Sequence, residues 1–450
     1  MTATEPSLDT PLFAEHVGEL SRRWSDALTA SAFDGALIAA GRARTYFLDD
    51  QAPTFRANPH LAQWLGDDDC EGSLILITAD GQAQLFFHQP DDYWHQPPKA
   101  PDHLNAFMSI EVFPDPDTLA DAAMTRAQQL NRVAFIGEDL PGNLPVAESN
   151  PAQLVNRIHY QRAYKTGFEL ACMREATRKA VLGHKAAGEA FHGGASEFEI
   201  HLRYLEASEQ TEADVPYPNI VALNEHAGVL HYQHYDRQPP AARHSFLIDA
   251  GARHRCYASD VTRTYASATQ ATGNEAFAAL IADLDATQQE LIGSIRIGQN
   301  YLALHEDMHQ RLGGLLAAHG LVACSAEAAF ELGITRTFLP HGLGHLLGIQ
   351  THDVGGQQTS PTGGLNAPPD VYPALRLTRT VESGQVFTIE PGIYFIPKLL
   401  KELSASEHAH VVNWDRVDAF LPHGGIRIED NVLVGTNGVE NLTRNAFANL

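Results

Sequence analysis

Two aspartates near the middle of the chain are the first residues whose types and spacing could do chemistry. Asp249 ends the apolar run SFLID, and Asp260 begins a second strand-like pattern in ASDVTRTY. If the chain turns back at His254-Arg255, the two carboxylates face each other with Cβ atoms about 4.5–5.5 Å apart. Carboxylates this close repel each other unless a cation lies between them. Taken singly, each is more commonly a turn or strand-edge aspartate.

The segment His341-Gly-Leu-Gly-His345 has the i, i+4 histidine spacing of helical zinc peptidases. A glycine stands where such a site needs its glutamate base, so we reject the helical zinc site. Two glycines in five residues instead predict a loop whose backbone passes close to a ligand. Considered alone, a histidine in such a loop is more often structural than metal-binding.

Two glutamates stand at the ends of apolar runs near the C-terminus. Glu390 lies in FTIEPG, and Glu429 lies in GIRIEDN, two residues after Arg427. Period-two alternation puts Arg427 and Glu429 on one face of a strand. Charged residues in such strands are rarely buried without a partner, so the alternative to metal binding is an Arg427–Glu429 ion pair.

Together these candidates supply four carboxylates and one imidazole, a nominal charge of −4 that two divalent ions would neutralise. Mostly oxygen ligands suit Mn²⁺, although Zn²⁺ or Co²⁺ can also occupy such a site. Two ions about 3.5–4 Å apart can deprotonate a shared water near neutral pH. The sequence therefore predicts an enzyme with a carboxylate-rich dinuclear metal centre. Its five predicted ligands are Asp249, Asp260, His345, Glu390 and Glu429.

The elements that must position these residues fall into two predicted domains. The chain has 450 residues, more than the ~250–300 at which single cores stop growing. Up to about residue 160, helical stretches alternate with short apolar runs such as GALIAAG and LILIT, which predicts a small α/β domain over residues 1–160. Within it, Asp80-Gly81 predicts a hairpin between two of these runs.

Residues 161–450 show a repeated order of helices and strands. Capping boxes at Thr166–Glu169 and Ser196–Glu199 predict the starts of two helices, followed by strand-like runs. Two more helical patterns, over about residues 274–295 and 301–319, precede VFTIEPGIYF and GIRIEDNVLVG. Two such halves would wrap one curved sheet, with the site shared between them.

Composition limits the partners of the chain. Its 31 Lys and Arg against 55 Asp and Glu give a net charge of −24, which would repel nucleic acid and anionic membranes. The first twenty residues lack a secretory pattern, and no eighteen apolar residues stand together. The four cysteines are scattered and fit reduced core positions. We expect a cytoplasmic protein that binds neither nucleic acid nor membranes.

The motifs resemble those of the pita-bread metallopeptidases, and within them the prolidases, or Xaa-Pro dipeptidases. The similar segments include FLDD, NIVALNEHAGVLHY, LIDAG, SDVTRTY, HGLGHLLGIQTHD, TIEPGIYFI, GGIRIEDN and VENLTR. The resemblance implies an α/β fold: a creatinase-like N-terminal domain, residues 1–160, and a pita-bread catalytic domain, residues 161–450. The latter would be a pseudo-twofold curved antiparallel sheet with helices, whose five predicted ligands hold two divalent ions.

The resemblance also implies catalytic roles beyond metal binding. Glu390 would carry a proton to the proline nitrogen. Three histidines, His231, His341 and His352, would orient the substrate and stabilise the oxyanion. The substrate would be a small dipeptide with a trans proline at its C-terminal position.

A dipeptidase must recognise the free carboxylate of its substrate, and an arginine suits this task because its planar fork donates two parallel hydrogen bonds. The family's arginine corresponds to Arg376, fourteen residues before Glu390. Arg427 is the second candidate, and Arg379 lies close enough to Arg376 to compete with it.

The resemblance leaves three alternative activities open and also implies a second copy of the chain as partner. The chain could be an aminopeptidase that acts on longer peptides, although the insertion with NWDRVDAFLPHGG resembles the dipeptidase branch. It could be a non-catalytic binding domain, but such relatives lose ligands and all five are present here. Promiscuous hydrolysis of organophosphorus esters is a further activity of the fold. The family also implies a homodimer in which FLDD, ending at Asp50, reaches across the interface and restricts substrate size.

Overall fold

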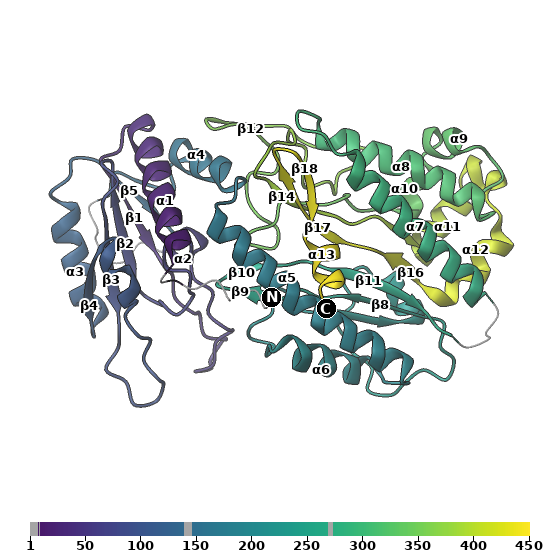
Figure 1. Cartoon of the computed structure of the whole chain (residues 1–450), viewed down its shortest axis with the longest axis horizontal. Coiled ribbons are helices and arrows are strands. Elements are labelled where there is room, and N and C mark those ends of the chain that lie inside the picture. Colours follow the sequence, from purple (N-terminus) through teal and green to yellow (C-terminus); the bar gives the residue numbers. More distant parts are fainter. Residues whose placement is uncertain (1–7, 9, 139–145, 269–272) are drawn as a thin grey trace. The chain divides into compact units, whose positions relative to one another are not determined.

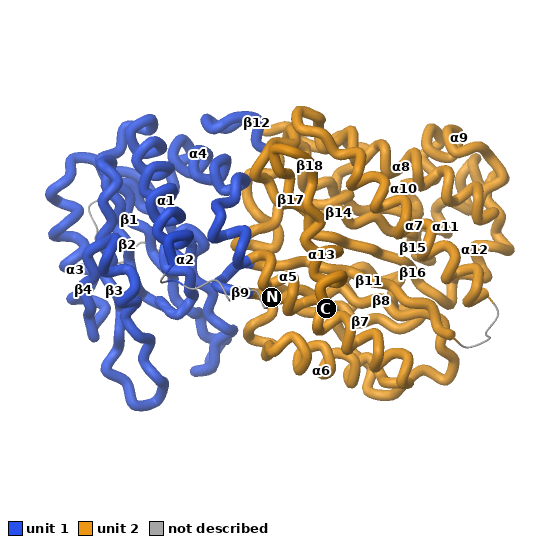
Figure 2. Tube along the Cα trace, viewed as in Figure 1, with its two compact units in different colours: residues 1–172, 254–257, 358–364 blue, residues 173–253, 258–357, 365–450 orange. Residues whose placement is uncertain are grey.

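The computed structural model describes residues 8, 10–138, 146–268 and 273–450. The chain forms two compact units (Figure 2). Unit 1 comprises residues 1–172 with two later segments, 254–257 and 358–364, and unit 2 comprises residues 173–253, 258–357 and 365–450. Two short pieces of the C-terminal half are thus built into the N-terminal unit, a division that periodicity along the sequence does not reveal.

Unit 1 is built on a six-stranded sheet of order β4-β3-β2-β1-β5-β6. β1 pairs antiparallel with β2 and parallel with β5, and α1 and α3 lie on opposite sides of the sheet (Figure 1). The strands are β1 (Gly35–Ala39), β2 (Leu74–Thr78), β3 (Ala83–His88), β4 (Ser109–Phe113), β5 (Val133–Ile136) and β6 (Glu148–Ser149). The helices are α1 (Pro11–Ala30), α2 (Pro59–Leu65), η1 (Asp102–Ala106), α3 (Pro116–Ala127) and α4 (Ala152–Arg162).

The hairpin predicted at Asp80-Gly81 is confirmed. β2 and β3 pair antiparallel, and the Thr78 amide donates to the Gln82 carbonyl at 2.9 Å. Gly81 takes a φ of +84°, which glycine adopts without the steric cost that a side chain would add.

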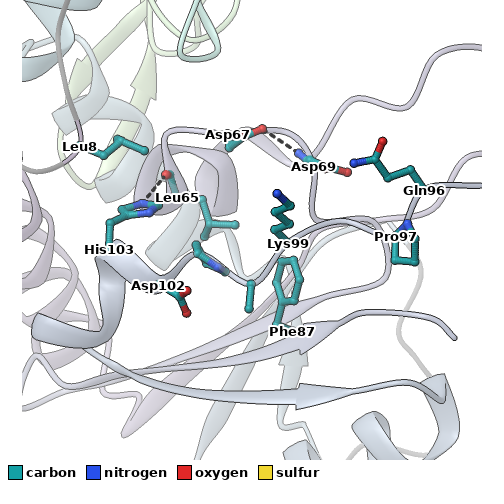
Figure 3. A pocket seen from close by; sticks show the side chains of 12 residues that line it. Leu8, Leu65, Asp67, Asp69, Phe87, Gln96, Pro97, Lys99, Asp102 and His103 are labelled. Atoms are coloured by element: carbon teal, nitrogen blue, oxygen red, sulfur yellow. Dashed lines mark hydrogen bonds between the residues drawn. The ribbon is translucent and has the colours of Figure 1, made fainter.

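A cavity of about 700 Å³ opens in unit 1 (Figure 3). Its lining mixes three carboxylates with Lys99 and His103. None of the residues that the sequence singled out for metal binding or catalysis lines it, so the predicted chemistry must be sought in unit 2.

Unit 2 contains two consecutive series of helices and strands, as predicted. In the first, α5 (Gly167–His192), whose first residues belong to unit 1, and α6 (Glu197–Ser208) precede the antiparallel sheet of β7 (Ile220–Leu223), β8 (Ser245–Asp249) and β11 (Thr262–Ala266). In the second, α7 (Asn274–Ser294) and α8 (Tyr301–Ala318) precede the antiparallel sheet of β14 (Val386–Ile389), β17 (Asp430–Gly435) and β18 (Gly438–Asn441). An antiparallel bridge between Thr262 and Glu429 joins the two sheets.

Shorter elements complete the chain. Among the described residues, no helix is long and apolar enough to cross a membrane. The remaining strands are β9 (Arg253–His254), β10 (Tyr257–Ala258), β12 (Gln358–Ser360), β13 (Gly363–Leu365), β15 (Gly392–Tyr394) and β16 (Gly425–Arg427). The remaining helices are η2 (Asn224–Gly228), α9 (Ala326–Glu331), α10 (Ile334–Phe338), α11 (Pro397–Ser404), η3 (Glu407–Val411), α12 (Trp414–Phe420), η4 (Leu421–His423) and α13 (Leu442–Ala448).

The helix starts follow from local sequence. Ser196 and Glu199 exchange hydrogen bonds at 2.8 and 3.3 Å, the predicted capping box of α6. Thr166 and Glu169 do the same at the start of α5. Side chains of α5 and α6 then pack on β7 and β8 in one apolar cluster, where each fully buried large side chain contributes about 1.5–3 kcal/mol.

The predicted register between Asp249 and Asp260 is wrong. Asp249 pairs with Thr262, two residues beyond Asp260. The turn lies between β9 and β10, where Arg255 and Cys256 have φ values of +50° and +69°. A two-residue hairpin of type I′ has positive φ at both central positions. Glycine or asparagine at these positions would have indicated such a turn, but arginine and cysteine do not. The turn therefore falls one residue later than predicted.

Candidate metal centre

Asp249 and Asp260 converge on one hydroxyl despite the shifted register. The Tyr217 hydroxyl lies 2.7 Å from Asp249 Oδ1 and 2.5 Å from Asp260 Oδ1. A phenol has a single proton to donate, so it can satisfy only one of the two carboxylates. The second close contact therefore needs a proton on a carboxyl group or a nearby cation, and the counter-charges at hand are Arg427 beside Asp249 and His345 beside Asp260.

His345 brings Glu390 to the same place. Its Nε2 atom lies 3.3 Å from Asp260 Oδ2 and 3.7 Å from Glu390 Oε1. The other ring nitrogen, Nδ1, lies 3.0 Å from the Leu346 carbonyl and must be the protonated one, because a carbonyl only accepts. Nε2 is therefore the atom that faces the carboxylates. Burial lowers the pKa of His345, but the hydrogen bond with Asp260 and the charges of Glu390 and Asp260 outweigh it and raise the pKa, so without a cation Nε2 carries a proton towards Asp260. A metal ion would take the place of this proton, with Nδ1–H held by a carbonyl as in many metal-binding histidines.

Glu429 completes the group of carboxylates. Thr262 donates its hydroxyl to Glu429 Oε2 at 2.8 Å, and ligand atoms of Asp260, His345 and Glu429 all lie within 4.8 Å of one another. Asp249 joins through Tyr217 and Glu390 joins through His345, so the structure brings all five predicted ligands together in unit 2.

The electrostatics of this cluster fit divalent cations. Burial, reinforced by the neighbouring carboxylates, raises the pKa of Glu429 well above its usual range and raises the pKa of Glu390 to about 7. Burial also raises the pKa of Asp249, against the opposing effect of Arg427. For Asp260, burial raises the pKa, but the hydrogen bond with His345 and the charge of that residue outweigh it and lower the pKa. The four carboxylates lie close together, and the pKa values of three of them are raised. Bound cations would stabilise the ionised form of such a set of oxygen donors.

The glycines around the histidines are required by close packing. A Cβ atom on Gly344 would lie 2.1 Å from the Thr388 carbonyl oxygen, and one on Gly342 would lie 3.0 Å from the Leu375 Cα atom. The segment is not helical, which confirms the predicted loop. Its backbone packs on β14, the strand that ends next to Glu390, and this contact places His345 beside that glutamate.

Arg427 is fully engaged inside the site. It forms an ion pair with Asp249 at 2.7 Å and hydrogen bonds with Thr262 Oγ1 at 3.2 Å and the Tyr394 hydroxyl at 2.8 Å. The alternative predicted from alternation, an ion pair with Glu429, is wrong. Thr262 lies between these two side chains, because its hydroxyl contacts both of them.

The three predicted catalytic histidines lie around the carboxylates. His341 Nε2 lies 2.9 Å from the Tyr394 hydroxyl, and burial, followed by the charge of Arg427, lowers the pKa of His341 to about 3. The His352 ring centre lies 4.4 Å from that of His345, and burial lowers the pKa of His352 to about 4. His231 is exposed, and its charge helps to depress the pKa of both other histidines.

Arg376 lies close to this group. It is exposed, and after burial and His345 its charge is the next cause of the lowered pKa of His352. Arg379 is buried and lies 3.4 Å from Glu382. Arg376 thus acts electrostatically on His352, whereas Arg379 pairs with Glu382.

Two tyrosines at the site were missed from the sequence. Tyr217 stands between two prolines, where no periodic pattern reveals a face. Tyr394 follows Glu390 by four residues in EPGIYF, and strand alternation would have placed both on one face. Its hydroxyl contacts both His341 and Arg427.

Known proteins match both parts of the chain. Residues 171–436 match the model of metallopeptidase family M24, and residues 11–160 match that of the Xaa-Pro dipeptidase N-terminal domain. A Xaa-Pro dipeptidase of Aeromonas hydrophila is 45% identical over 97% of this chain and 98% of its own length. One of Pseudoalteromonas haloplanktis is 43% identical over 96% and 98%.

Solved structures share the fold at lower identity. Aminopeptidase PepP of Pseudomonas aeruginosa superposes with a TM-score of 0.73 at 22% identity, covering 96% of this chain and 95% of its own. Aminopeptidase P of Escherichia coli, with the inhibitor Pro-Leu, gives the same values. The predicted pita-bread architecture is therefore confirmed. From its family models and its full-length relatives, the chain belongs to metallopeptidase family M24 and, within it, to the Xaa-Pro dipeptidases.

Proposed function

We propose that this protein hydrolyses dipeptides with a trans proline at the C-terminal position, and that five residues hold two divalent ions for this reaction, with Mn²⁺ preferred over Zn²⁺ or Co²⁺. The proposed ligands are Asp249, Asp260, His345, Glu390 and Glu429. The observation that carries this is the convergence of these side chains around Tyr217 and His345. When bound, such ions polarise a scissile carbonyl and make hydroxide available near neutral pH.

Glu390 is the proposed proton carrier. Without bound cations, burial raises the pKa of its carboxyl group to about 7, and its two oxygens lie 3.7 Å from His341 Nδ1 and from His345 Nε2, beside the other proposed site residues. Proline nitrogen carries no hydrogen in the peptide bond and must gain a proton to leave as a secondary amine. Glu390 would accept the proton of the attacking water and deliver it to that nitrogen.

His341 and His352 would contact the substrate as neutral donors. Since burial holds the pKa values of His341 and His352 at about 3 and 4, both rings are uncharged near neutral pH and retain one N–H each. Such donors, with His231, suit the carbonyl oxygen whose negative charge grows during attack.

Arg376 is the proposed partner of the substrate carboxylate, with Arg427 as the second candidate. Arg427 already donates from Nε and both terminal nitrogens to protein groups. Arg376 is exposed and acts electrostatically on His352, so its planar fork suits a bidentate contact with the proline carboxylate.

We also propose a cytoplasmic homodimer in which the loop containing FLDD covers the partner's site and limits substrates to two residues. Phe47 and Leu48 in this loop are 92% and 90% exposed, and large apolar side chains grouped on a surface commonly mark an interface. Four free cysteines suit a reducing compartment.

The test compares Ala-Pro with Ala-Pro-Ala as substrates of chelator-stripped protein before and after addition of Mn²⁺. We expect metal-restored hydrolysis of the dipeptide alone. Cleavage of the tripeptide would indicate an aminopeptidase instead. No activity on either peptide, together with no metal uptake, would indicate a non-catalytic binding domain.

A further inference from the structure

A second buried carboxylate group lies away from the metal centre, in the first turn of α6. Glu197 is 1% exposed and accepts four hydrogen bonds. Oε1 accepts from the Leu223 amide at 2.8 Å and contacts His226 Nδ1 at 2.7 Å. Oε2 accepts from the Tyr232 hydroxyl at 2.9 Å and the Asp236 amide at 2.7 Å. All four partners belong to one segment, residues 223–236, which begins at the last residue of β7.

This segment carries His231. Glu197 holds it at its start, Leu223, and again at Asp236, thirteen residues later. The His226 and Tyr232 rings stack between these points, with centres 4.4 Å apart and planes at 20°. His231 directly precedes Tyr232, so the backbone that carries the histidine is held through its neighbour.

Glu197, His226 and Asp236 could also be considered as a cation site, because they can place ligand atoms within 4.8 Å of one another. The hydrogen bonds argue against this. Both Glu197 oxygens already accept from backbone amides, and each has a second contact, with His226 Nδ1 or the Tyr232 hydroxyl. A carboxylate with four donors around it needs no cation to be stable in a buried position.

We propose that Glu197 is a positioning residue for His231, acting through the loop that it holds. The proposal rests on the proposed function, since it assigns Glu197 a part in substrate orientation only if His231 has one. Glu197→Gln replaces one acceptor oxygen with an NH₂ group that faces donors, so the loop must rearrange. A displacement of about 1 Å of an orienting group can cost about 100-fold in rate. We expect a loss of about 10- to 100-fold in kcat/KM.

The experiment measures kcat/KM on Ala-Pro for Mn²⁺-loaded wild type, E197Q, H231A and the double variant. We expect E197Q to cause little further loss when His231 is already absent. Glu199→Gln is the matched control. Glu199 lies in the same helical turn, and among the described residues its side chain forms hydrogen bonds only with Ser196, so we expect this change to leave kcat/KM unchanged. Tyr232→Phe removes one of the four donors and should show a smaller loss with the same dependence on His231.

Metal binding and amide exchange separate the possible failures. Calorimetry of stripped E197Q should give the wild-type Mn²⁺ affinity and stoichiometry, and hydrogen exchange should increase in residues 223–236. Equal losses from E197Q with and without His231, or wild-type activity of H231A, would overturn the positioning role. A bound metal equivalent lost in both E197Q and H226A would overturn it in favour of a cation site. Wild-type protein inactive on Ala-Pro would refute the proposed function itself, independently of the exchange result.

Discussion

Arg427 forms an ion pair with Asp249 inside the metal centre, with 2.7 Å between Nη2 and Oδ2 and side chains only 5% and 13% exposed. This cation changes the charge balance counted from the sequence. Four carboxylates and Arg427 sum to −3, so two divalent ions would leave the site at +1. This net positive charge would favour hydroxide and the oxyanion that forms when hydroxide attacks the carbonyl, because each carries one negative charge.

Because of this ion pair, we expect Arg427→Met to lower the free energy of unfolding by an amount that depends on bound metal. In stripped protein at pH 8, the change leaves Asp249 without its cation, and we expect the free energy of unfolding to fall by about 3–5 kcal/mol. With Mn²⁺ bound the loss should be smaller, because the ions neutralise the same carboxylate. Urea unfolding with and without Mn²⁺ checks this. An equal loss in both states would show that Arg427 stabilises the fold independently of the metal centre.

The raised pKa of Glu390 should make the stability of the metal-free protein depend on pH. The pKa of this side chain is raised from 4.5 to about 7 in the folded state, so its contribution to stability is fully present below pH ~4.5 and is lost as the pH rises through 7. The shift corresponds to up to about 3 kcal/mol. We therefore expect Glu390→Gln to stabilise the metal-free protein at pH 8 but not at pH 4.5.

Thermal unfolding of chelator-treated wild type and E390Q across this pH range is the measurement. Mn²⁺-loaded protein provides the control, because the bound ions replace protons on the ligand and should remove the difference in slope. Parallel stability curves for the two metal-free proteins would contradict the raised pKa of Glu390.

The sequence predicted what depends on local chemistry and missed what depends on distant contacts. The capping boxes at Thr166 and Ser196 and the helical periods of α7 and α8 act within a few residues, and the structure contains them. The hairpin register failed because Arg255 and Cys256 adopt positive φ without a residue type that signals it. The partner of Arg427 lies 178 residues away, beyond any inference from strand alternation.

Gln288 on α7 holds the backbone next to two of the proposed metal ligands. Its fully buried side chain donates to the carbonyls of Ile389 at 2.9 Å and Ile428 at 3.4 Å, the residues just before Glu390 and Glu429. We expect Gln288→Leu to weaken Mn²⁺ binding about 10- to 100-fold, as loss of supporting groups around metal ligands typically does. Calorimetry on stripped protein measures this. Thr287→Ala, on the exposed side of the same helix, should leave the affinity unchanged.

Gly344 lies where the loop of residues 341–345 packs too closely on β14 to admit a side chain. A Cβ atom there would lie 2.1 Å from the Thr388 carbonyl oxygen, so Gly344→Ala must push the loop away from β14 and move His345 from Asp260 and Glu390. We expect lower stability and loss of tight Mn²⁺ binding, measured by thermal unfolding and calorimetry.

Gly314 in α8 is the matched control, because a Cβ atom there meets nothing within 4 Å. Gly314→Ala should stabilise the protein by about 0.5–1 kcal/mol, since alanine favours a helix interior over glycine, and should leave metal binding unchanged. If Gly344→Ala bound Mn²⁺ as tightly as the wild type, the loop could yield without moving His345. The close contact with Thr388 would then serve packing alone.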